Sequence, residues 1–330
     1  MDLGALGVYA CLFMGLYFEV FLLISFFEKR PSQKTAHGPR RFPAVSIIVP
    51  CYNEERTIAA TVQSLLALEY QKKKLNIVVV DEKVYRPRNL LEHMQAVEYI
   101  FGVFFKKMFD NLASISVLPG PFSLYRREVF QKVGTFRHAH NTEDMEMAFR
   151  MHAHGLKIAN AHTAYVHTTV PKTLRTLLTQ RVRWSQGYLQ NSLDYRYMYG
   201  NLRFGHFGMF TLPFGLAAFA AGLYLAGYML YHVATTLGAR TLTLWATGIP
   251  LRPPALPTEW FFLNTSMMLF LTVAVFLMTL AAIILGARIA QARLSAKSLA
   301  IYFVLFGFVA PLWLLRAVWN TARVRESVWR

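Results

Sequence analysis

The chain has 330 residues, of which 55% are hydrophobic, and it carries 35 Lys and Arg against 18 Asp and Glu, a formal net charge of +17. So high an apolar content is unusual for a soluble domain and indicates membrane segments. With only Cys11 and Cys51 in the chain, a cysteine-based metal site is excluded and a disulfide between the two is implausible.

Four apolar segments are predicted, three of which match the roughly 20 residues that a helix needs to cross a bilayer. Along the chain they are 3–27, 207–237, 261–287 and a shorter run at 300–315 that contains Pro311. We expect a transmembrane helix within 1–28 and a C-terminal membrane region of about three helices within 201–330. A cleaved signal peptide is disfavoured for the first segment, because it lacks a basic beginning and a small-x-small cleavage site.

The basic residues follow the pattern of loops on the inner side of a membrane. They gather in a linker at 29–42 and again between the last two apolar segments. By the positive-inside rule, residues 28–205 are expected in the cytoplasm and the N-terminus outside, with basic residues near anionic lipid. The net charge therefore requires no nucleic acid. Four spans would place the Arg-rich end outside, which leaves the topology of the last segment open.

Residues 43–200 are predicted to form one α/β domain. Apolar runs indicate strands at 46–49 and 77–80, and helical spacing between them at 54–68 completes a β-α-β unit. Further helices are expected at 89–108, 145–154 and 172–197. Pro119-Gly120-Pro121 is expected to be a turn between two short strands, 114–118 and 122–125.

Gln180, Arg183 and Trp184 form the strongest candidate site. Their spacing places them on one face of a helix. Arg binds phosphate bidentately, Trp offers a flat surface for a sugar ring, and Gln can bridge hydroxyls. The alternative is an amphipathic helix lying on the membrane surface, where Arg and Trp are also frequent.

A second candidate is Asn141-Thr142-Glu143-Asp144, which precedes a helix. An ionised Asp144 at the edge of a cleft can take a proton from an attacking hydroxyl. The alternative is a purely structural cap, with Asn141 as the N-cap residue and Asp144 three positions later.

Two predicted strand exits carry polar residues that would suit a nucleotide. Tyr52 and Glu54 follow the first strand after Pro50, and Asp81 follows the second. Ligands of open α/β sheets bind beyond the carboxyl ends of the strands, so this set can hold a base and a ribose. Taken alone, residues 49–54 are also an ordinary strand-to-helix turn.

Together these segments resemble the membrane-embedded family 2 glycosyltransferases, which include synthases of cellulose, chitin, hyaluronan and poly-N-acetylglucosamine. The resemblance covers most of residues 43–190, and the flanking apolar segments fit the layout of that family. The matching segments, in family order, are VSIIVPCYNEE at 45–55, IVVVD at 77–81, LPGPFSLYRREVFQKVGTF at 118–136, TED at 142–144 and QRVRW at 180–184.

The resemblance implies a GT-A-like nucleotide-sugar domain and a role for each matched residue. Asp144 would be the base for inverting, in-line attack by the acceptor hydroxyl, and Arg183 would steady the leaving diphosphate. The remaining roles implied are contacts to the uridine of a UDP-sugar for Pro50, Tyr52, Glu54 and Asp81, and contacts to the acceptor for Gly120, Glu143, Gln180 and Trp184.

The chain departs from that family after Asp81. The resemblance implies an Asp-x-Asp element downstream that holds a divalent cation, Mg²⁺ or Mn²⁺, on the diphosphate, yet the sequence contains no Asp-x-Asp. Either a segment is missing near 81–83, or the chain lacks the metal ligands and is inactive. We favour a missing segment, because a β-α-β domain without its central strand would be hard to fold.

The predicted function is transfer of a sugar from a UDP-sugar to a growing β-linked polysaccharide, with export through the C-terminal helices. Two alternatives stay open. The first is transfer of a single sugar to a lipid carrier such as a polyprenyl phosphate, since about three C-terminal helices are few for an export channel. The second is a non-catalytic scaffold of a synthase complex, which the lack of metal carboxylates would favour.

Overall fold

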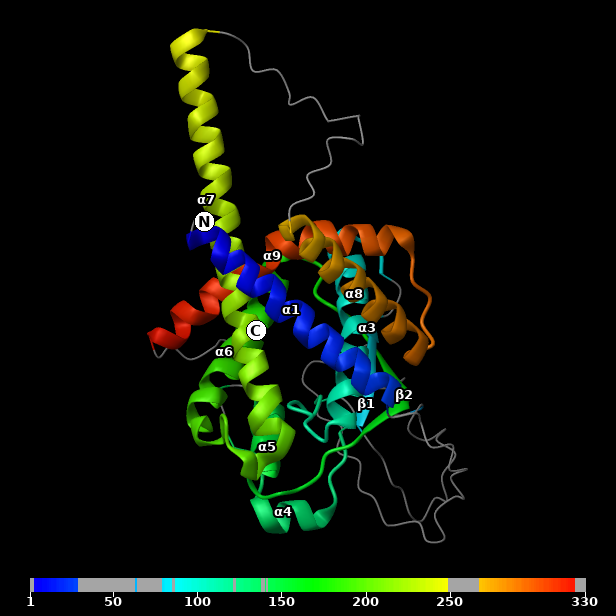
Figure 1. The fold of residues 1–330 in the computed structure, drawn as a ribbon. Coiled ribbons are helices and arrows are strands. Elements are labelled where there is room, and N and C mark those ends of the chain that lie inside the picture. Colours follow the sequence, from blue (N-terminus) through cyan, green and yellow to red (C-terminus); the bar gives the residue numbers. More distant parts are fainter. Residues whose placement is uncertain are drawn as a thin grey trace.

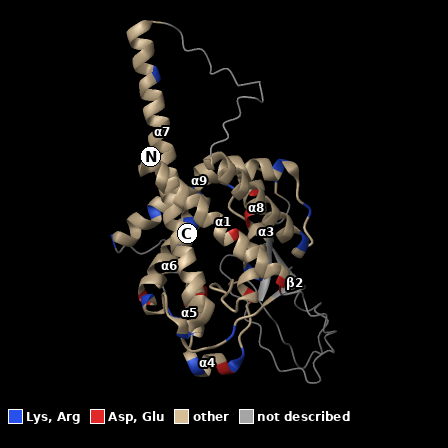
Figure 2. Ribbon diagram, in the orientation of Figure 1, with Lys and Arg blue, Asp and Glu red and all other residues tan. Residues whose placement is uncertain are grey.

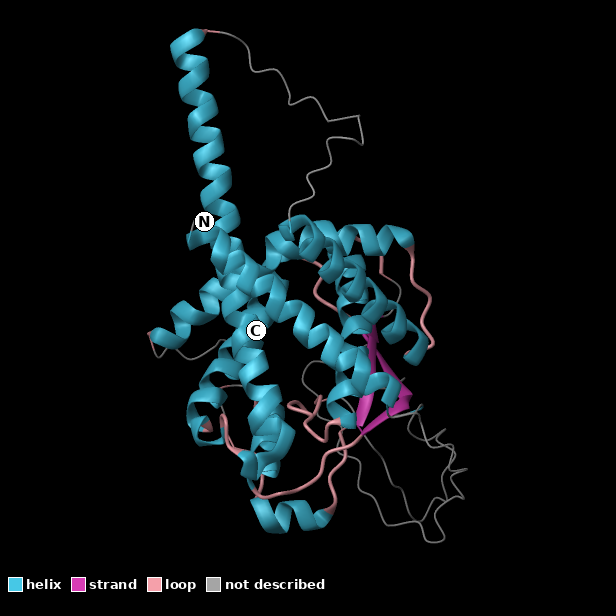
Figure 3. Ribbon diagram, viewed as in Figure 1, coloured by secondary structure: helices cyan, strands magenta, loops and turns pink. Residues whose placement is uncertain are grey.

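The computed structural model of the protein describes residues 3–28, 63, 79–84, 87–120, 123–137, 140, 142–248 and 267–323, with backbone alone for residues 79–84 and 161–167. Helices make up most of the described chain, and two strands lie to one side of them (Figures 1 and 3).

Each of the four predicted apolar segments contributes a helix that is long and apolar enough to cross a membrane. They are α1 (Leu3–Glu28), α7 (Leu212–Thr247, preceded by a π-helical turn at Phe207–Thr211), α8 (Met267–Ile289) and α9 (Ala296–Ala322). Pro311 lies inside α9, which is longer than the run at 300–315 predicted. The chain is therefore an integral membrane protein. In Figure 2, long stretches of α1, α7 and α8 carry no charged residue, whereas α4 is strongly charged.

The described residues between α1 and α7 include the α-helices α3 (Leu90–Asn111), α4 (Arg127–Val133), α5 (Glu143–Ala153) and α6 (Leu174–Asp194). Capping boxes fix two of their starts. In α3, Asn89 accepts a hydrogen bond from the Glu92 backbone and Glu92 accepts one from the Asn89 backbone. In α6, Thr173 and Thr176 form the equivalent pair. The helices predicted at 89–108, 145–154 and 172–197 are thus present.

The two strands, β1 (Val79–Val84) and β2 (Asn160–Thr168), pair in parallel. Asp81 lies inside β1 rather than at its exit, so the predicted strand end was wrong. The register jumps beside it: Val80 pairs with Ala161, and Asp81 with Tyr165. The predicted strand at 46–49 and nearly all of the helix at 54–68 lie outside the described residues, so the α/β core remains a prediction.

Residues 114–119 and 123–126 form loops, so the two short strands predicted around Gly120 were wrong there. Their apolar side chains are buried in a core, although their backbone does not form strands. Ile115 and Leu118 are buried in a core with α4, α5 and Ile158. The loop is thereby anchored against α5.

The remaining cores join this segment directly to the membrane helices. α3 and α6 pack against α8 and α9 around Leu177, Ile283 and Trp313. α1 joins α3 and α8 around Leu22 and Met108. Because these contacts are continuous, the position of α6 is set by the membrane helices as well as by α5.

Candidate functional site

Asp144 lies in the first turn of α5, where its carboxylate Oδ1 accepts a hydrogen bond of 2.8 Å from the backbone N–H of Met145. Burial raises the pKa of Asp144 to about 6, and the neighbouring carboxylate of Glu143 adds to the increase. The Met145 N–H and the Arg183 guanidinium oppose it. Asp144 is therefore ionised at neutral pH, yet basic enough to take a proton.

The alternative in which Asn141 caps this helix was wrong about the capping residue. The N-cap residue of α5 is Thr142, and Asn141 lies outside the described residues. The Thr142 side chain makes no capping hydrogen bond with its own helix. Its hydroxyl instead accepts a hydrogen bond of 3.0 Å from Asn191 on α6.

Tyr125 is a neighbour of Asp144 that the sequence did not identify. Burial raises the pKa of its hydroxyl, and the carboxylates of Asp144 and Glu143 raise it further. The ring packs against Phe130 and Phe136. Tyr125 thus keeps its proton at neutral pH and can donate a hydrogen bond beside Asp144. Its place shortly after the Pro-Gly-Pro turn was the only available signal.

Gln180, Arg183 and Trp184 all belong to α6, as predicted from their spacing. Among the described residues, the buried Oε1 of Gln180 has no hydrogen-bond partner. Arg183 lies close enough to Asp144 to lower the pKa of that carboxyl.

A partly buried ion pair lies next to Trp184. The guanidinium of Arg181 lies 4.3 Å from the centroid of the indole ring and donates a hydrogen bond of 2.9 Å to Glu98 on α3. Arg181 is only 5% exposed. This ion pair joins α6 to α3, and the alternative of a helix lying on the membrane surface stays open for α6.

Trp184 also lines a cavity of about 410 Å³ between the site and the membrane helices. Met145, next to Asp144, contributes to the same wall. The other lining residues, from α6, α7 and α9, are Ser185, Tyr188, Gly215, Ala218, Phe219 and Leu314. The cavity is open and mostly apolar, and it extends from the first turn of α5 to the beginning of α7.

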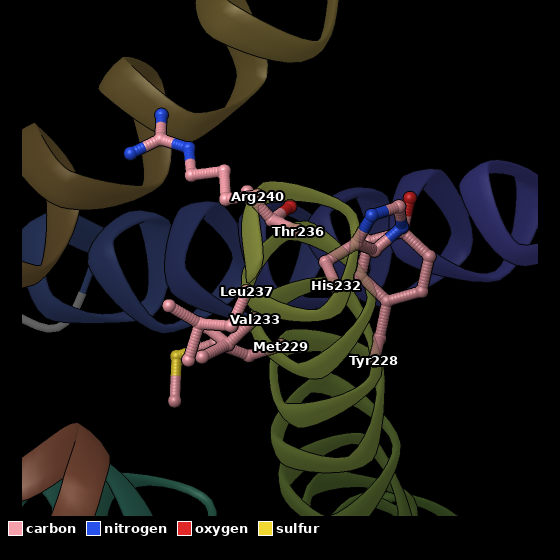
Figure 4. Close-up of a pocket in the computed structure, with 7 residues that line it drawn as sticks. All are labelled: Tyr228, Met229, His232, Val233, Thr236, Leu237 and Arg240. Carbon is pink, nitrogen blue, oxygen red and sulfur yellow. The ribbon is translucent and has the colours of Figure 1, made fainter. Parts of the chain in front are cut away.

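A second hollow of about 560 Å³ lies along α7, as Figure 4 shows. The described residues that line it all come from that helix: Tyr228, Met229, His232, Val233, Thr236, Leu237 and Arg240. None of these seven is a predicted site residue. The smaller cavity at Trp184 is therefore the one relevant to the candidate site.

The structure gives less information on the other predicted site residues. Pro50, Tyr52 and Glu54 lie outside the described residues, and only the backbone of Asp81 is described. Gly120 is exposed, with open space where a side chain would project, and follows Leu118, which packs on α5.

No group of three or more His, Cys, Asp or Glu side chains that could hold a metal ion occurs among the described residues. The charge of Asp144 is already offset in part by Arg183. The described residues therefore do not fit a divalent cation, and its ligands would have to come from elsewhere in the chain.

Comparison with known proteins defines the class to which the chain belongs. The sequence profile described as "Glycosyl transferase family group 2" matches residues 60–319. The chain belongs to this family, and the predicted family resemblance is confirmed.

Among curated proteins, the chain is similar to poly-beta-1,6-N-acetyl-D-glucosamine synthases. It is 30% identical to that of Staphylococcus aureus (strain COL) over 115 residues, which are 34% of this chain and 28% of the relative. It is 26% identical to that of Staphylococcus epidermidis over 141 residues, which are 42% of this chain and 34% of the relative. The matched regions thus cover about a third or less of those proteins.

Proposed function

We propose that the protein transfers a sugar from a UDP-sugar to the hydroxyl group of a growing β-linked glycan, with inversion at the anomeric carbon. The observation that carries this proposal is the position of Asp144. The pKa of Asp144 is raised to about 6, and its carboxylate interacts electrostatically with Arg183. The cavity lined by Trp184 is next to it, at Met145. Membership of glycosyl transferase family group 2 supports the reaction class.

In the proposed step, the ionised carboxylate of Asp144 removes the proton from the acceptor hydroxyl. The acceptor oxygen then attacks the anomeric carbon from the face opposite the diphosphate. The glycosidic bond forms as the bond to the diphosphate oxygen breaks, and UDP leaves with that electron pair. Arg183 would offset the charge that develops on the diphosphate, and Tyr125 would hold the acceptor hydroxyl or Asp144 in place.

The acceptor glycan would occupy the cavity at Trp184. Its aromatic and aliphatic walls suit the faces of sugar rings. We place Gln180, four residues before Trp184 on α6, at the same acceptor end. We place Gly120 and Glu143 at the same end. Because the cavity adjoins α7 and α9, a polymer extended there would be directed toward the membrane. N-acetylglucosamine is the sugar we propose, from the names of the similar synthases.

The donor would bind on the side of β1, with Pro50, Tyr52, Glu54 and Asp81 around the uridine. A divalent cation on the diphosphate belongs to the proposal through the family, and it requires carboxylates other than those described. The proposed topology places the segment between α1 and α7 in the cytoplasm and the N-terminus outside, following the basic loops.

One alternative product has a specific observation in its favour. The cavity at Trp184 is mostly apolar and is open to the membrane helices, which would also suit a lipid-linked acceptor. Such an enzyme would transfer one sugar to a carrier such as a polyprenyl phosphate. The scaffold alternative predicts no transfer at all.

The test is incubation of the full chain in lipid nanodiscs with a panel of radiolabelled nucleotide sugars and Mg²⁺ or Mn²⁺. The proposal predicts UDP release from UDP-N-acetylglucosamine and a ladder of polymer lengths. A single lipid-soluble product would favour the carrier alternative. No release from any nucleotide sugar would contradict the enzyme and favour the scaffold.

A further inference from the structure

The first turn of α5 is attached to α6 by contacts that have no part in capping or in the proposed chemistry. Thr142 occupies the N-cap position, where a threonine hydroxyl ordinarily accepts a hydrogen bond from the backbone of its own helix. In α5 the Thr142 side chain makes no capping hydrogen bond of that kind. The Nδ2 of Asn191 donates to that hydroxyl at 3.0 Å, and both side chains are buried, with exposures of 3% for Thr142 and 0% for Asn191.

Gly187 allows this contact to form. A Cβ atom at residue 187 would overlap the methyl group and the hydroxyl of Thr142, so any larger residue would push the two helices apart. Asn191 completes the contact by donating a second hydrogen bond, of 2.8 Å, to the backbone oxygen of Gly187. Gly187 and Asn191 are four residues apart, so they form one docking face of α6.

One turn farther along both helices, a second contact keeps the same alignment. The Tyr195 hydroxyl donates a hydrogen bond of 2.7 Å to Oε1 of Glu146, whose other oxygen accepts one of 2.8 Å from Arg150. Glu146 is buried, at 4% exposure. The two contacts fix both the separation of α5 from α6 and their register.

This docking face is on the same helix as Gln180 and Trp184, while Thr142 immediately precedes Glu143 and Asp144. We propose that Thr142, Gly187 and Asn191 form a clamp that positions Asp144 against the Gln180–Trp184 segment, so that acceptor deprotonation depends on it. The inference rests on the proposed function, because it assigns the clamp to that reaction. These three are positioning residues, which act through Asp144 without touching the substrate.

The test uses the full chain with Gly187→Ala, Thr142→Gly and the double variant. Gly187→Ala should lower the turnover of sugar transfer by about hundredfold, because a displacement of about 1 Å in a catalytic group can cost that much. The KM for the nucleotide sugar should change less than twofold. Thr142→Gly removes the overlapping atoms and should restore turnover by about tenfold in the Gly187→Ala background.

Gly102→Ala is the matched control, since Gly102 is a helical glycine of α3 with nothing near its Cβ direction. It should retain turnover within about twofold. Asn191→Ala is a second variant without steric overlap, and it should lower turnover by about tenfold while leaving the donor KM unchanged. A wild-type rate in Gly187→Ala, or a double variant no faster than Gly187→Ala, would overturn the inference.

Failure of the proposed function is distinguishable from failure of the clamp. If the wild-type chain transfers no sugar, the proposed function fails, and the thermal unfolding of the same variants decides the clamp. The clamp then requires that the double variant unfold at a higher temperature than Gly187→Ala. Strictly additive decreases in the unfolding temperature would rule it out.

Discussion

The two halves of the candidate site are built differently. The half that carries Asp144, Gln180 and Trp184 lies on two helices joined by buried polar contacts, and one of them, α6, packs against the membrane helices α8 and α9. The half assigned to the donor has a single described strand, β1, which pairs only with β2 among the described elements. Parallel sheets are normally larger and covered on both faces. The first half therefore has its structural support in place, whereas the second needs more chain than these strands provide.

The largest expected effect is on the helical half of the site and comes from replacing Asp144. Asp144→Asn should reduce sugar transfer by about 10²- to 10⁴-fold at pH 7.5, the range attributable to a general base. Donor affinity should persist, because Asp144 is assigned to the acceptor hydroxyl. Radiolabel incorporation measures transfer, and equilibrium binding of UDP measures the donor site.

Stability provides the control for that substitution. The pKa of Asp144 is raised in the folded state, so the folded protein holds this proton more tightly than the unfolded chain does. Its contribution to stability is greatest at low pH and is lost as the pH rises through about 6. Asp144→Asn should therefore not lower the unfolding temperature at pH 7.5, and a large decrease would mean that the loss of activity reflects unfolding.

The second prediction addresses the β1 half. Inserting directly after Asp81 a segment with the Asp-x-Asp element that the family resemblance implies should raise metal-dependent transfer by about hundredfold, since a cation on the diphosphate contributes several kcal/mol. The same insert with both Asp residues replaced by Asn is the control. Equal rates with the two inserts would contradict the missing-segment hypothesis.

The third prediction concerns the link between the halves, which is Arg183. Arg183→Ala should lower turnover by about 30-fold, because it removes a charged hydrogen-bond donor from the leaving diphosphate. Arg183→Lys should recover only part of that loss, since an ammonium group cannot bind two oxygens in the same fork. Turnover under saturating donor is the measurement, and full activity of Arg183→Ala would remove Arg183 from the site.

The smallest expected effect is at the acceptor cavity. Trp184→Ala should raise the KM for a short oligosaccharide acceptor by about tenfold, the loss of roughly 1.4 kcal/mol of ring stacking. The KM for the UDP-sugar should stay within twofold. Trp184→Phe keeps an aromatic face, so its KM for the acceptor should lie between those of the wild type and Trp184→Ala. An effect on the donor KM alone would place Trp184 in the donor half.

The sequence predicted the helical half well because its signals are local. Helical spacing placed Gln180, Arg183 and Trp184 on one helix and predicted another at 89–108, which is α3. Contacts between helices were not predictable, because nothing in the spacing brings Thr142 to Gly187 or Tyr125 to Asp144. β2 was missed, and Asp81 was wrongly placed at a strand end, since strand limits depend on pairing partners far along the chain.

The central claim is that a carboxylate with a raised pKa on α5 removes the proton from the acceptor. The most direct test is the turnover of sugar transfer from pH 4.5 to 8 with saturating donor and acceptor. We predict that turnover rises with pH, reaches half its maximum close to pH 6 and falls about tenfold per pH unit below that. Turnover that is independent of pH across this range, or that decreases as the pH rises, would contradict the assignment of Asp144 as the base.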